Sequence, residues 1–235
     1  MRSPGKDPQH PELRLHEEIL LLALRDDRGT IDHRAASYRY AMAGGLLAEL
    51  LLENRIALTP GRRPVMEVVD DRPLGDALLD DALVRMRGAR RRARLSAWVS
   101  RLAGLRDLRL HVARSLCERG ILQERVESVL LFFSRRVYPT IDARHERWIL
   151  ERLRLAIFDA EPRIDLRTSV LAALASGAGL LVVAFSRKEL RTRRRRIEQL
   201  CAGNLLALAT HDAVQAAVQE ACAAACAAAC AAACG

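Results

Sequence analysis

Two arginines at the predicted start of a helix carry the clearest chemical signal in this chain of 235 residues. Arg106 and Arg109 lie three positions apart, so they share one face of a helix predicted over Asp107–Arg119. Guanidinium groups can donate paired hydrogen bonds to one phosphate, and a helix N-terminus adds unpaired N–H groups and a favourable dipole. The pair therefore predicts an anion-binding site. A solvated basic face is the alternative that the residues alone leave open.

A second candidate segment is Arg125–Val137, where alternation gives way to an apolar run and predicts a β-hairpin. Neighbouring residues on a strand point to opposite faces, so an unbroken apolar run cannot place every side chain in the core. Some of these side chains must contact lipid, another subunit or a covering helix. The run consists of Val129, Leu130, Leu131, Phe132 and Phe133.

Enzyme motifs are missing from the sequence. It contains no Gly-x-Gly-x-x-Gly after a strand, no phosphate-binding loop, no Gly-x-Ser-x-Gly and no His-Glu-x-x-His. The acidic pairs Glu17–Glu18 and Asp80–Asp81 are adjacent, so their members diverge by about 100° on a helix. That geometry is typical of capping and solvated charge. We therefore predict no enzyme activity, no cofactor and no metal site.

The charge balance favours an anionic partner. The formal net charge is +9, which predicts attraction to phospholipid, nucleic acid or acidic protein. The densest runs are Arg90–Arg92 with Arg94, and Arg193–Arg196. Nucleic acid is the chief competitor of phospholipid here, but aromatic residues do not alternate with these arginines, which weighs against it. Solvated faces, or parts of a membrane-facing field, are the simpler interpretation of both runs.

Composition predicts a mostly α fold, a single globular helical domain with one or two small β-hairpins. Half of the residues are apolar but only 4% are aromatic, so Leu, Ala and Val must fill the core. We expect this domain to span residues 12–220. Residues 1–11 are polar and rich in proline, which predicts a disordered tail without a secretory signal. Residues 221–235 are predicted to form an Ala/Cys low-complexity helix or tail.

Periodicity places the helices. Gly44–Gly45 inside the second helix predicts a closely packed neighbour. Val170–Phe185 is apolar but shorter than the roughly 20 residues that span a bilayer, so it is interpreted as a buried helix, broken near Gly177–Gly179. A first hairpin is expected over Ile56–Val69. Helices are expected around Leu15–Ala23 and near His33–Asn54, Gly75–Arg87, Arg91–Leu102, Asp107–Arg119, Asp142–Phe158, Leu166–Phe185, Lys188–Cys201 and His211–Cys234.

Four cysteines near the C-terminus recur every four residues among alanines and form one stripe on a helix. They are Cys222, Cys226, Cys230 and Cys234. A packed or frayed Ala/Cys helix is the simplest interpretation. Reversible S-acylation is the alternative, since each buried CH₂ of an acyl chain contributes roughly 0.8 kcal/mol to membrane binding. No histidine or carboxylate alternates with these thiols as a metal site would require.

Several segments, in one order, resemble the Golgi phosphoprotein 3 family, and the resemblance runs from about Leu13 to about Gln219. It implies a mostly helical domain with a β-hairpin, a non-catalytic adaptor role, and a basic pocket for phosphatidylinositol 4-phosphate. Eukaryotic members recruit Golgi enzymes or cytoskeletal motors from that platform. The matching segments are Leu13–Thr30, Gly44–Leu52, Gly75–Leu83, Arg106–Arg109, Leu116–Leu122, Leu131–Phe133 and Tyr138–Thr140.

The resemblance also implies roles for particular residues. Arg106 and Arg109 match the Arg-x-x-Arg that grips the inositol phosphate, while Arg34 stands at the position of the family's lipid-contacting tryptophan and Ala43 at that of its early arginine. The apolar hairpin matches the family's segment for membrane contact and self-association. Arg34 can replace the charge that is lost at Ala43, but the aromatic contact of the tryptophan is lost. Selectivity for phosphatidylinositol 4-phosphate over other anionic lipids is therefore an open question.

The expected function is a peripheral membrane adaptor that binds anionic phospholipid and recruits a client protein, with homo-oligomerisation as a further expectation. A basic nucleic-acid-binding protein and a lipid-independent protein scaffold are the alternatives. The expected location is cytoplasmic and peripheral at a membrane. That membrane would be the cytosolic face of the Golgi in a eukaryote, or the inner membrane surface in a bacterium.

Overall fold

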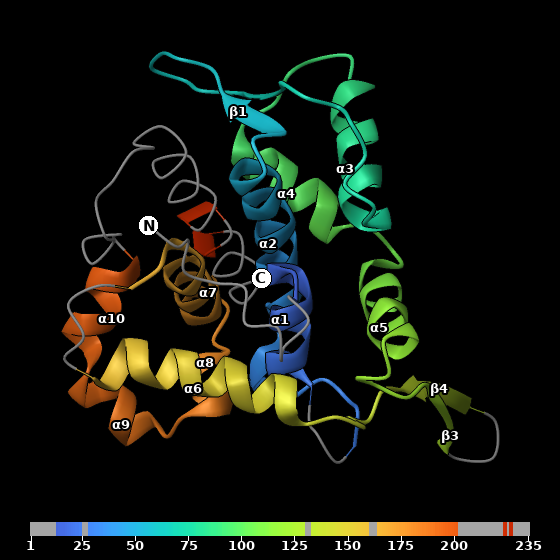
Figure 1. The fold of residues 1–235 in the computed structure, drawn as a ribbon, viewed down its shortest axis with the longest axis vertical. Helices are drawn as coiled ribbons and strands as arrows, with labels where there is room; N and C mark the ends of the chain where they lie inside the picture. The colour runs from blue at the N-terminus through green and yellow to red at the C-terminus, as the bar shows by residue number, and fades with distance from the viewer. Residues whose placement is uncertain are drawn as a thin grey trace, which may run out of the picture.

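The computed structural model describes residues 13–24, 28–129, 133–159, 164–201, 223–224 and 226–227. Within these residues the chain is mostly helical with two small antiparallel hairpins, which confirms the predicted fold class (Figure 1). The helices are α1 Leu15–Ala23, the 3-10 helix η1 His33–Ala35, α2 Tyr38–Leu52, α3 Ala77–Arg87, α4 Leu95–Ala103, α5 Leu108–Glu118, α6 Arg144–Phe158, α7 Leu166–Gly177, α8 Leu181–Ala184, α9 Arg187–Thr192 and α10 Arg194–Cys201. The strands are β1 Ile56–Leu58, β2 Met66–Val68, β3 Arg125–Val129 and β4 Phe133–Val137.

Helix α1 lies at the centre of the molecule. All of its residues are buried, and it packs against α2, α5, α6 and α7 (Figure 1). A helix that is covered on every side must be apolar on most of its faces, and Leu15, Ile19 and Leu22 meet that requirement. The opening segment of the domain is thus its core helix.

The contact between α1 and α2 depends on Gly45. A Cβ atom at this position would lie 3.0 Å from the backbone nitrogen of His16 and 3.2 Å from the Cδ1 atom of Ile19. Glycine inside a helix costs stability, but here it lets two helix backbones approach closely. The prediction that a closely packed neighbour offsets this cost is confirmed for Gly45.

The expectation that Glu17 and Glu18 carry solvated charge is wrong. Both side chains are buried, with relative exposures of 1% and 0%. Glu17 accepts hydrogen bonds from Arg119 at 2.8 Å and from the Ser115 hydroxyl at 3.0 Å, and it also accepts one from the backbone N–H of Arg14 at 2.9 Å. Capping by Glu17 is therefore present, but inside the protein.

Two further carboxylates of the central helices are paired in the interior. Glu18 accepts from Arg152 of α6 at 2.7 Å, and Glu49 of α2 accepts from Arg167 of α7. Burial raises the pKa of Glu18, an effect that the guanidinium of Arg152 opposes. These arginines come from helices more than a hundred residues further along the chain, so no local pattern could reveal them. The pairs fix how α6 and α7 sit on the central helices.

The acidic pair of α3 behaves as expected. Asp80 accepts from the backbone N–H groups of Leu74 at 2.7 Å and Gly75 at 3.2 Å, so it holds the loop that leads into the helix. Asp81 forms an exposed ion pair with Arg85 one turn later, at 2.6 Å. Capping and solvated charge thus describe these two residues.

The two hairpins lie at opposite ends of the molecule (Figure 1). In the first, Ile56 pairs with Val68 and Leu58 with Met66. In the second, Arg125 pairs with Val137 and Val129 with Phe133, as the alternation in Arg125–Val137 predicts.

Three predicted helices are interrupted and one begins later than expected. The predicted helix His33–Asn54 divides into η1 and α2. The segment Leu166–Phe185 divides into α7 and α8 at Gly179, whose φ of +72° favours glycine, as the sequence predicts. Lys188–Cys201 divides at Arg193, which ends α9. Helix α4 begins at Leu95 rather than Arg91.

The interpretation of Val170–Phe185 as a buried segment is confirmed at both ends, since Val170 is 3% exposed and Phe185 is 5% exposed. Among the described residues, no helix combines the length and apolar character needed to cross a bilayer. Most of the predicted helix His211–Cys234 lies outside the described residues. Those described, 223–224 and 226–227, are helical.

Candidate anion-binding site

Arg106 and Arg109 lie at the start of α5, as predicted. Arg106 is exposed in the turn before the helix, and Arg109 is half-buried in the first turn. The Asp107 side chain does not cap the helix, and no acceptor among the described residues takes the backbone N–H of Arg109 or Leu110. Unpaired N–H groups at a helix start are suited to binding an anion, although the exposed carboxylate of Asp107 stands between the two arginines.

The loop before α5 is held by Arg39, an arginine of α2. Its Nε atom donates to the carbonyl of Ala103 at 3.0 Å and its Nη2 atom to the carbonyl of Leu105 at 2.5 Å. These bonds satisfy carbonyl groups at the end of α4 and in the loop, which fixes the turn that carries Arg106. Sequence reasoning gave Arg39 no such role, since the contact spans more than sixty residues.

Two tyrosines flank Arg109. Its guanidinium carbon lies 5.8 Å from the centre of the Tyr138 ring, within the range of a cation–π contact. Burial raises the pKa of Tyr38, and the nearby charges of Arg109 and Arg39 oppose the shift. Arg109 therefore lies against one aromatic ring, and its charge also acts on a second tyrosine.

The hydroxyl group of Tyr138 is an unusual feature beside Arg109. Tyr138 is 1% exposed, and its buried hydroxyl has no hydrogen-bond partner among the described residues. Burial raises the pKa of this phenol. An unpaired buried hydroxyl is costly, so its survival beside an anion-binding candidate is consistent with a site that a ligand completes.

Arg34 is engaged elsewhere. Its guanidinium donates to Asp32 at 2.9 and 3.0 Å and to the carbonyl of Val182 in the α8 segment at 2.8 Å. The guanidinium of Arg34 holds the pKa of Asp32 far below its usual range. The hollow beside Arg34, about 340 Å³ in volume, is also lined by the carboxylates of Asp32 and Glu146. The structure therefore brings Arg106 and Arg109 together but joins Arg34 to neither of them in any contact it describes.

The second hairpin is largely exposed, although Val137 at its base is 1% exposed. Val126 is 66% exposed, and the arginines of β4 pair with carboxylates of the facing segment, Arg135 with Glu127 at 2.9 Å and Arg136 with Glu124 at 3.2 Å. Exposed pairs of this kind are weak and can be exchanged for lipid phosphates. Leu130, Leu131 and Phe132 lie outside the described residues, and so do the side chains of Val129 and Phe133. Their contact with lipid or with another subunit stays a prediction.

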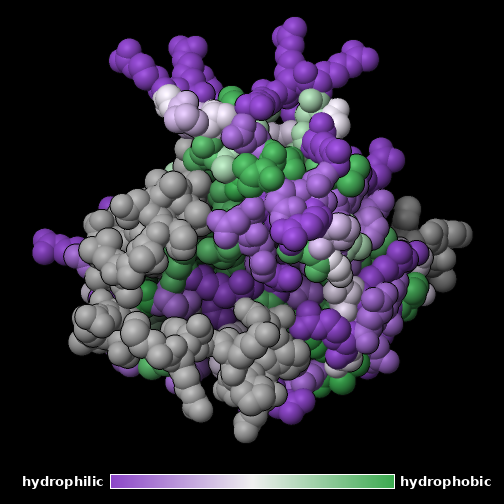
Figure 2. Space-filling model, turned by 45° about the horizontal axis from the view of Figure 1, so that its top comes forward, coloured by the Kyte–Doolittle hydropathy of each residue, from purple (hydrophilic) through white to green (hydrophobic). Residues whose placement is uncertain are grey.

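The arginine runs are largely solvated, as expected. Arg90–Arg92 and Arg94 are exposed, and the backbone N–H of Met66 donates to the carbonyl of Ala93 at 2.9 Å, which joins this run to the first hairpin and its exposed Arg62 and Arg63. Figure 2 shows long hydrophilic side chains that project from one end of the molecule. In the other run, Arg196 differs because its Nε atom donates to the carbonyl of Ala156 at 3.1 Å.

The sequence of this chain is similar to those of known proteins. A model of the Golgi phosphoprotein 3 family matches residues 15–225. The chain belongs to this family. It is 28% identical, over 81% of its length, to vacuolar protein sorting-associated protein 74 of Eremothecium gossypii, and 29% identical, over 53% of its length, to the protein of that name from Schizosaccharomyces pombe. The matches cover 66% and 42% of these relatives, so the chain spans less than two thirds of either one.

Part of the candidate site could be predicted from the sequence. The Arg-x-x-Arg spacing and its place at a helix start were predicted correctly. Arg39, Tyr38 and Tyr138 were not assigned to the site, because the contacts that gather them are long-range. Among the described residues, no group of three or more His, Cys, Asp or Glu side chains is placed to hold a metal ion.

Proposed function

We propose that this member of the Golgi phosphoprotein 3 family is a non-catalytic peripheral membrane adaptor. It binds an anionic phospholipid through Arg106 and Arg109 and holds a client protein at the membrane. Family membership supports a Golgi-associated adaptor role in general terms. The observation that carries the lipid assignment is the start of α5, where two arginines and unpaired N–H groups come together and Arg109 lies over the ring of Tyr138, whose buried hydroxyl has no partner among the described residues.

The head group is proposed to be a phosphorylated inositol, by resemblance phosphatidylinositol 4-phosphate. Arg34 does not reach toward Arg109 in the contacts described, so it is an unsuitable replacement for the family's aromatic contact. Arg39 and Tyr38 are better placed to line the pocket. We therefore expect binding to several anionic phospholipids with a modest preference among them.

Liposome sedimentation tests this proposal. Arg106→Ala with Arg109→Ala should weaken binding to anionic liposomes at least about tenfold, because hydrogen bonds to charged groups contribute about 1.5–3 kcal/mol each. Arg62→Ala with Arg63→Ala is the matched control, since it removes the same charge from the exposed turn of the first hairpin. Equal loss in both variants would show general electrostatic attraction and contradict a defined site.

Nucleic-acid binding is the second candidate, and a specific observation favours it. The first hairpin and the loop between α3 and α4 together present Arg62, Arg63, Arg90, Arg91 and Arg94, all exposed and without a carboxylate partner among the described residues. A gel shift on duplex DNA at the same salt concentration distinguishes the two functions. Tight DNA binding that is lost in the Arg62/Arg63 variant, together with no binding to liposomes, would replace the lipid proposal.

A further inference from the structure

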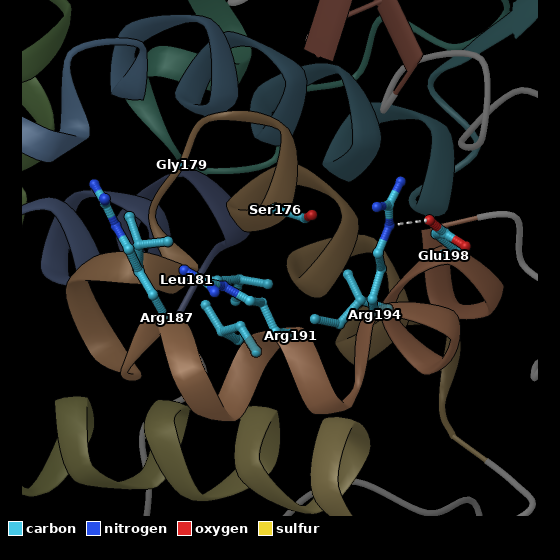
Figure 3. Close-up of a pocket in the computed structure, with 10 residues that line it drawn as sticks. Ser176, Gly179, Leu181, Arg187, Arg191, Arg194 and Glu198 are labelled. Carbon is cyan, nitrogen blue, oxygen red and sulfur yellow. Dashed lines mark hydrogen bonds and ion pairs between the residues drawn. The ribbon is translucent and has the colours of Figure 1, made fainter.

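A separate hollow lies between the end of α7 and the helices α9 and α10. Its volume is about 430 Å³, near the lower end of the range of roughly 300–1,000 Å³ for small-molecule sites. Its wall is aliphatic, and Figure 3 shows Leu181 on this wall with arginines around it. The aliphatic residues are Leu181, Val182, Leu190 and Ile197.

Local sequence creates this hollow. Gly179, with φ at +72°, ends α7 and turns the chain into the short helix α8. Ser186 then begins α9 in a capping box with Glu189, where the serine hydroxyl accepts from the Glu189 N–H at 3.2 Å and the carboxylate accepts from the Ser186 N–H at 3.0 Å. Two changes of direction within a few residues leave the aliphatic side chains of α8 and α9 facing a gap that no described side chain fills.

The rim of the hollow is strongly basic. Figure 3 shows Arg187 and Arg194 on opposite sides of the hollow, with Arg191 between them. Arg194 donates to Glu198 at 2.9 Å, which neutralises that pair. Arg187 and Arg191 are exposed and have no carboxylate partner among the described residues. Two uncompensated cations therefore border an apolar wall.

We propose that this hollow binds a single-chain anionic amphiphile. Its acyl chain lies against the aliphatic wall, and its carboxylate or phosphate head group accepts hydrogen bonds from Arg187 and Arg191. Among the described residues, the wall offers no aromatic ring for a nucleobase, and the polar side chains other than arginine are those of Ser176 and of Glu198, which is paired with Arg194. Sugars and nucleotides would leave their polar groups unsatisfied there, whereas an acyl chain would not. The site is independent of Arg106 and Arg109.

Displacement of a fluorescent fatty acid measures the binding. The competitors are oleate, oleoyl lysophosphatidic acid and oleoyl lysophosphatidylcholine, each below the concentration at which it forms micelles. We expect the two anionic ligands to displace the probe at concentrations at least about tenfold lower than the zwitterionic one, because it presents a quaternary ammonium group to the arginines. The relative strengths of oleate and lysophosphatidic acid distinguish a carboxylate from a phosphate head group. Equal displacement by all three ligands, or displacement only in the presence of micelles, would overturn the proposal.

Paired variants locate the site. Arg187→Gln with Arg191→Gln should weaken the anionic ligands at least about tenfold and leave lysophosphatidylcholine unchanged. Lys188→Gln with Arg193→Gln removes the same charge from exposed neighbours that do not line the hollow, so it should bind as the wild type does. Equal weakening of ligand binding in both double variants would show that net charge alone causes the effect, and would overturn the assignment.

Two further variants separate the wall from the rim and this site from the phospholipid site. Leu190→Ser should weaken anionic and zwitterionic ligands alike, because it removes aliphatic contact without changing charge. Arg106→Ala with Arg109→Ala should bind oleate as tightly as the wild type. Loss of oleate binding in that variant would show that the amphiphile occupies the start of α5 instead, and would overturn the second site while leaving the proposed function intact.

Discussion

The buried pair of Glu18 and Arg152 offers the sharpest test of how this fold is held together. The Glu18 side chain is 0% exposed, that of Arg152 is 15% exposed, and their N–O distance is 2.7 Å. Arg152→Met keeps much of the aliphatic stem but leaves the carboxylate buried without its partner. Such a loss costs about 3–5 kcal/mol, a large share of the roughly 5–15 kcal/mol that stabilises a typical domain. Denaturant unfolding followed by circular dichroism measures this difference.

The control for this variant is an ion pair of similar geometry on the surface. Arg135 and Glu127 of the second hairpin are 2.9 Å apart, with side-chain exposures of 54% and 44%. Arg135→Met should therefore change the free energy of unfolding by less than about 1 kcal/mol. A loss of less than about 1 kcal/mol for Arg152→Met as well would refute the reasoning, because it would mean that water reaches Glu18 freely.

A double variant and a pH series complete the test. Glu18→Leu with Arg152→Met should recover most of the loss, since replacing both members of a buried pair removes the uncompensated charge. In Arg152→Met alone, burial raises the pKa of Glu18 and only the charge of Arg167 still opposes this rise, so the folded state binds a proton that the unfolded state does not. Its free energy of unfolding should thus rise as pH falls through the raised pKa toward the unfolded value of about 4.3.

Four further outcomes are expected. Burial lowers the pKa of His16, so the unfolded chain takes up the proton first and stability should fall as pH drops below about 6.5; thermal melts of His16→Gln should lack this part of the pH dependence. Gly45→Ala places a Cβ atom 3.0 Å from a backbone nitrogen and should cost about 1–3 kcal/mol in denaturant unfolding. Arg39→Ala removes the hydrogen bond to the Ala103 carbonyl and one of the two to the Leu105 carbonyl, and should cost about 1–3 kcal/mol, with weaker liposome binding. Replacing Leu130 and Leu131 with Ser should weaken liposome binding without altering its salt dependence if the hairpin inserts, or lower the mass measured by light scattering if it joins subunits; a melt far below wild type would contradict both roles.

Local patterns predicted the features that depend on neighbouring residues. Glycine at position 45 predicted a close helix contact because its cost inside a helix needs a compensating neighbour, and Gly179 predicted a break because glycine readily adopts a positive φ. Alternation over Arg125–Val137 likewise predicted the second hairpin, which the pairing of these residues confirms without the register having been predicted.

The errors arose where distant residues decide the outcome. Glu17 and Glu18 occupy the first turn of a helix, a place where exposed carboxylates are common, and only the fold shows that Arg119 and Arg152 pair with them where they are buried. For Arg34 the partner is local, since Asp32 stands two residues earlier, yet the hydrogen bond to the carbonyl of Val182 could not be foreseen. The number of charged residues in the sequence therefore does not show how many of them are available to bind a ligand.

That distinction bears on the membrane proposal itself. Arginines that pair with buried carboxylates, such as Arg119, Arg152 and Arg167, contribute to the net charge but are committed to the fold. Arg106 and Arg191 lack such partners among the described residues, and both border a place where an anion could bind. If the proposals hold, the salt dependence of liposome binding should follow the few uncommitted arginines near the site rather than the net charge of +9. A slope that changes equally on removal of any exposed arginine would instead describe a diffuse basic surface.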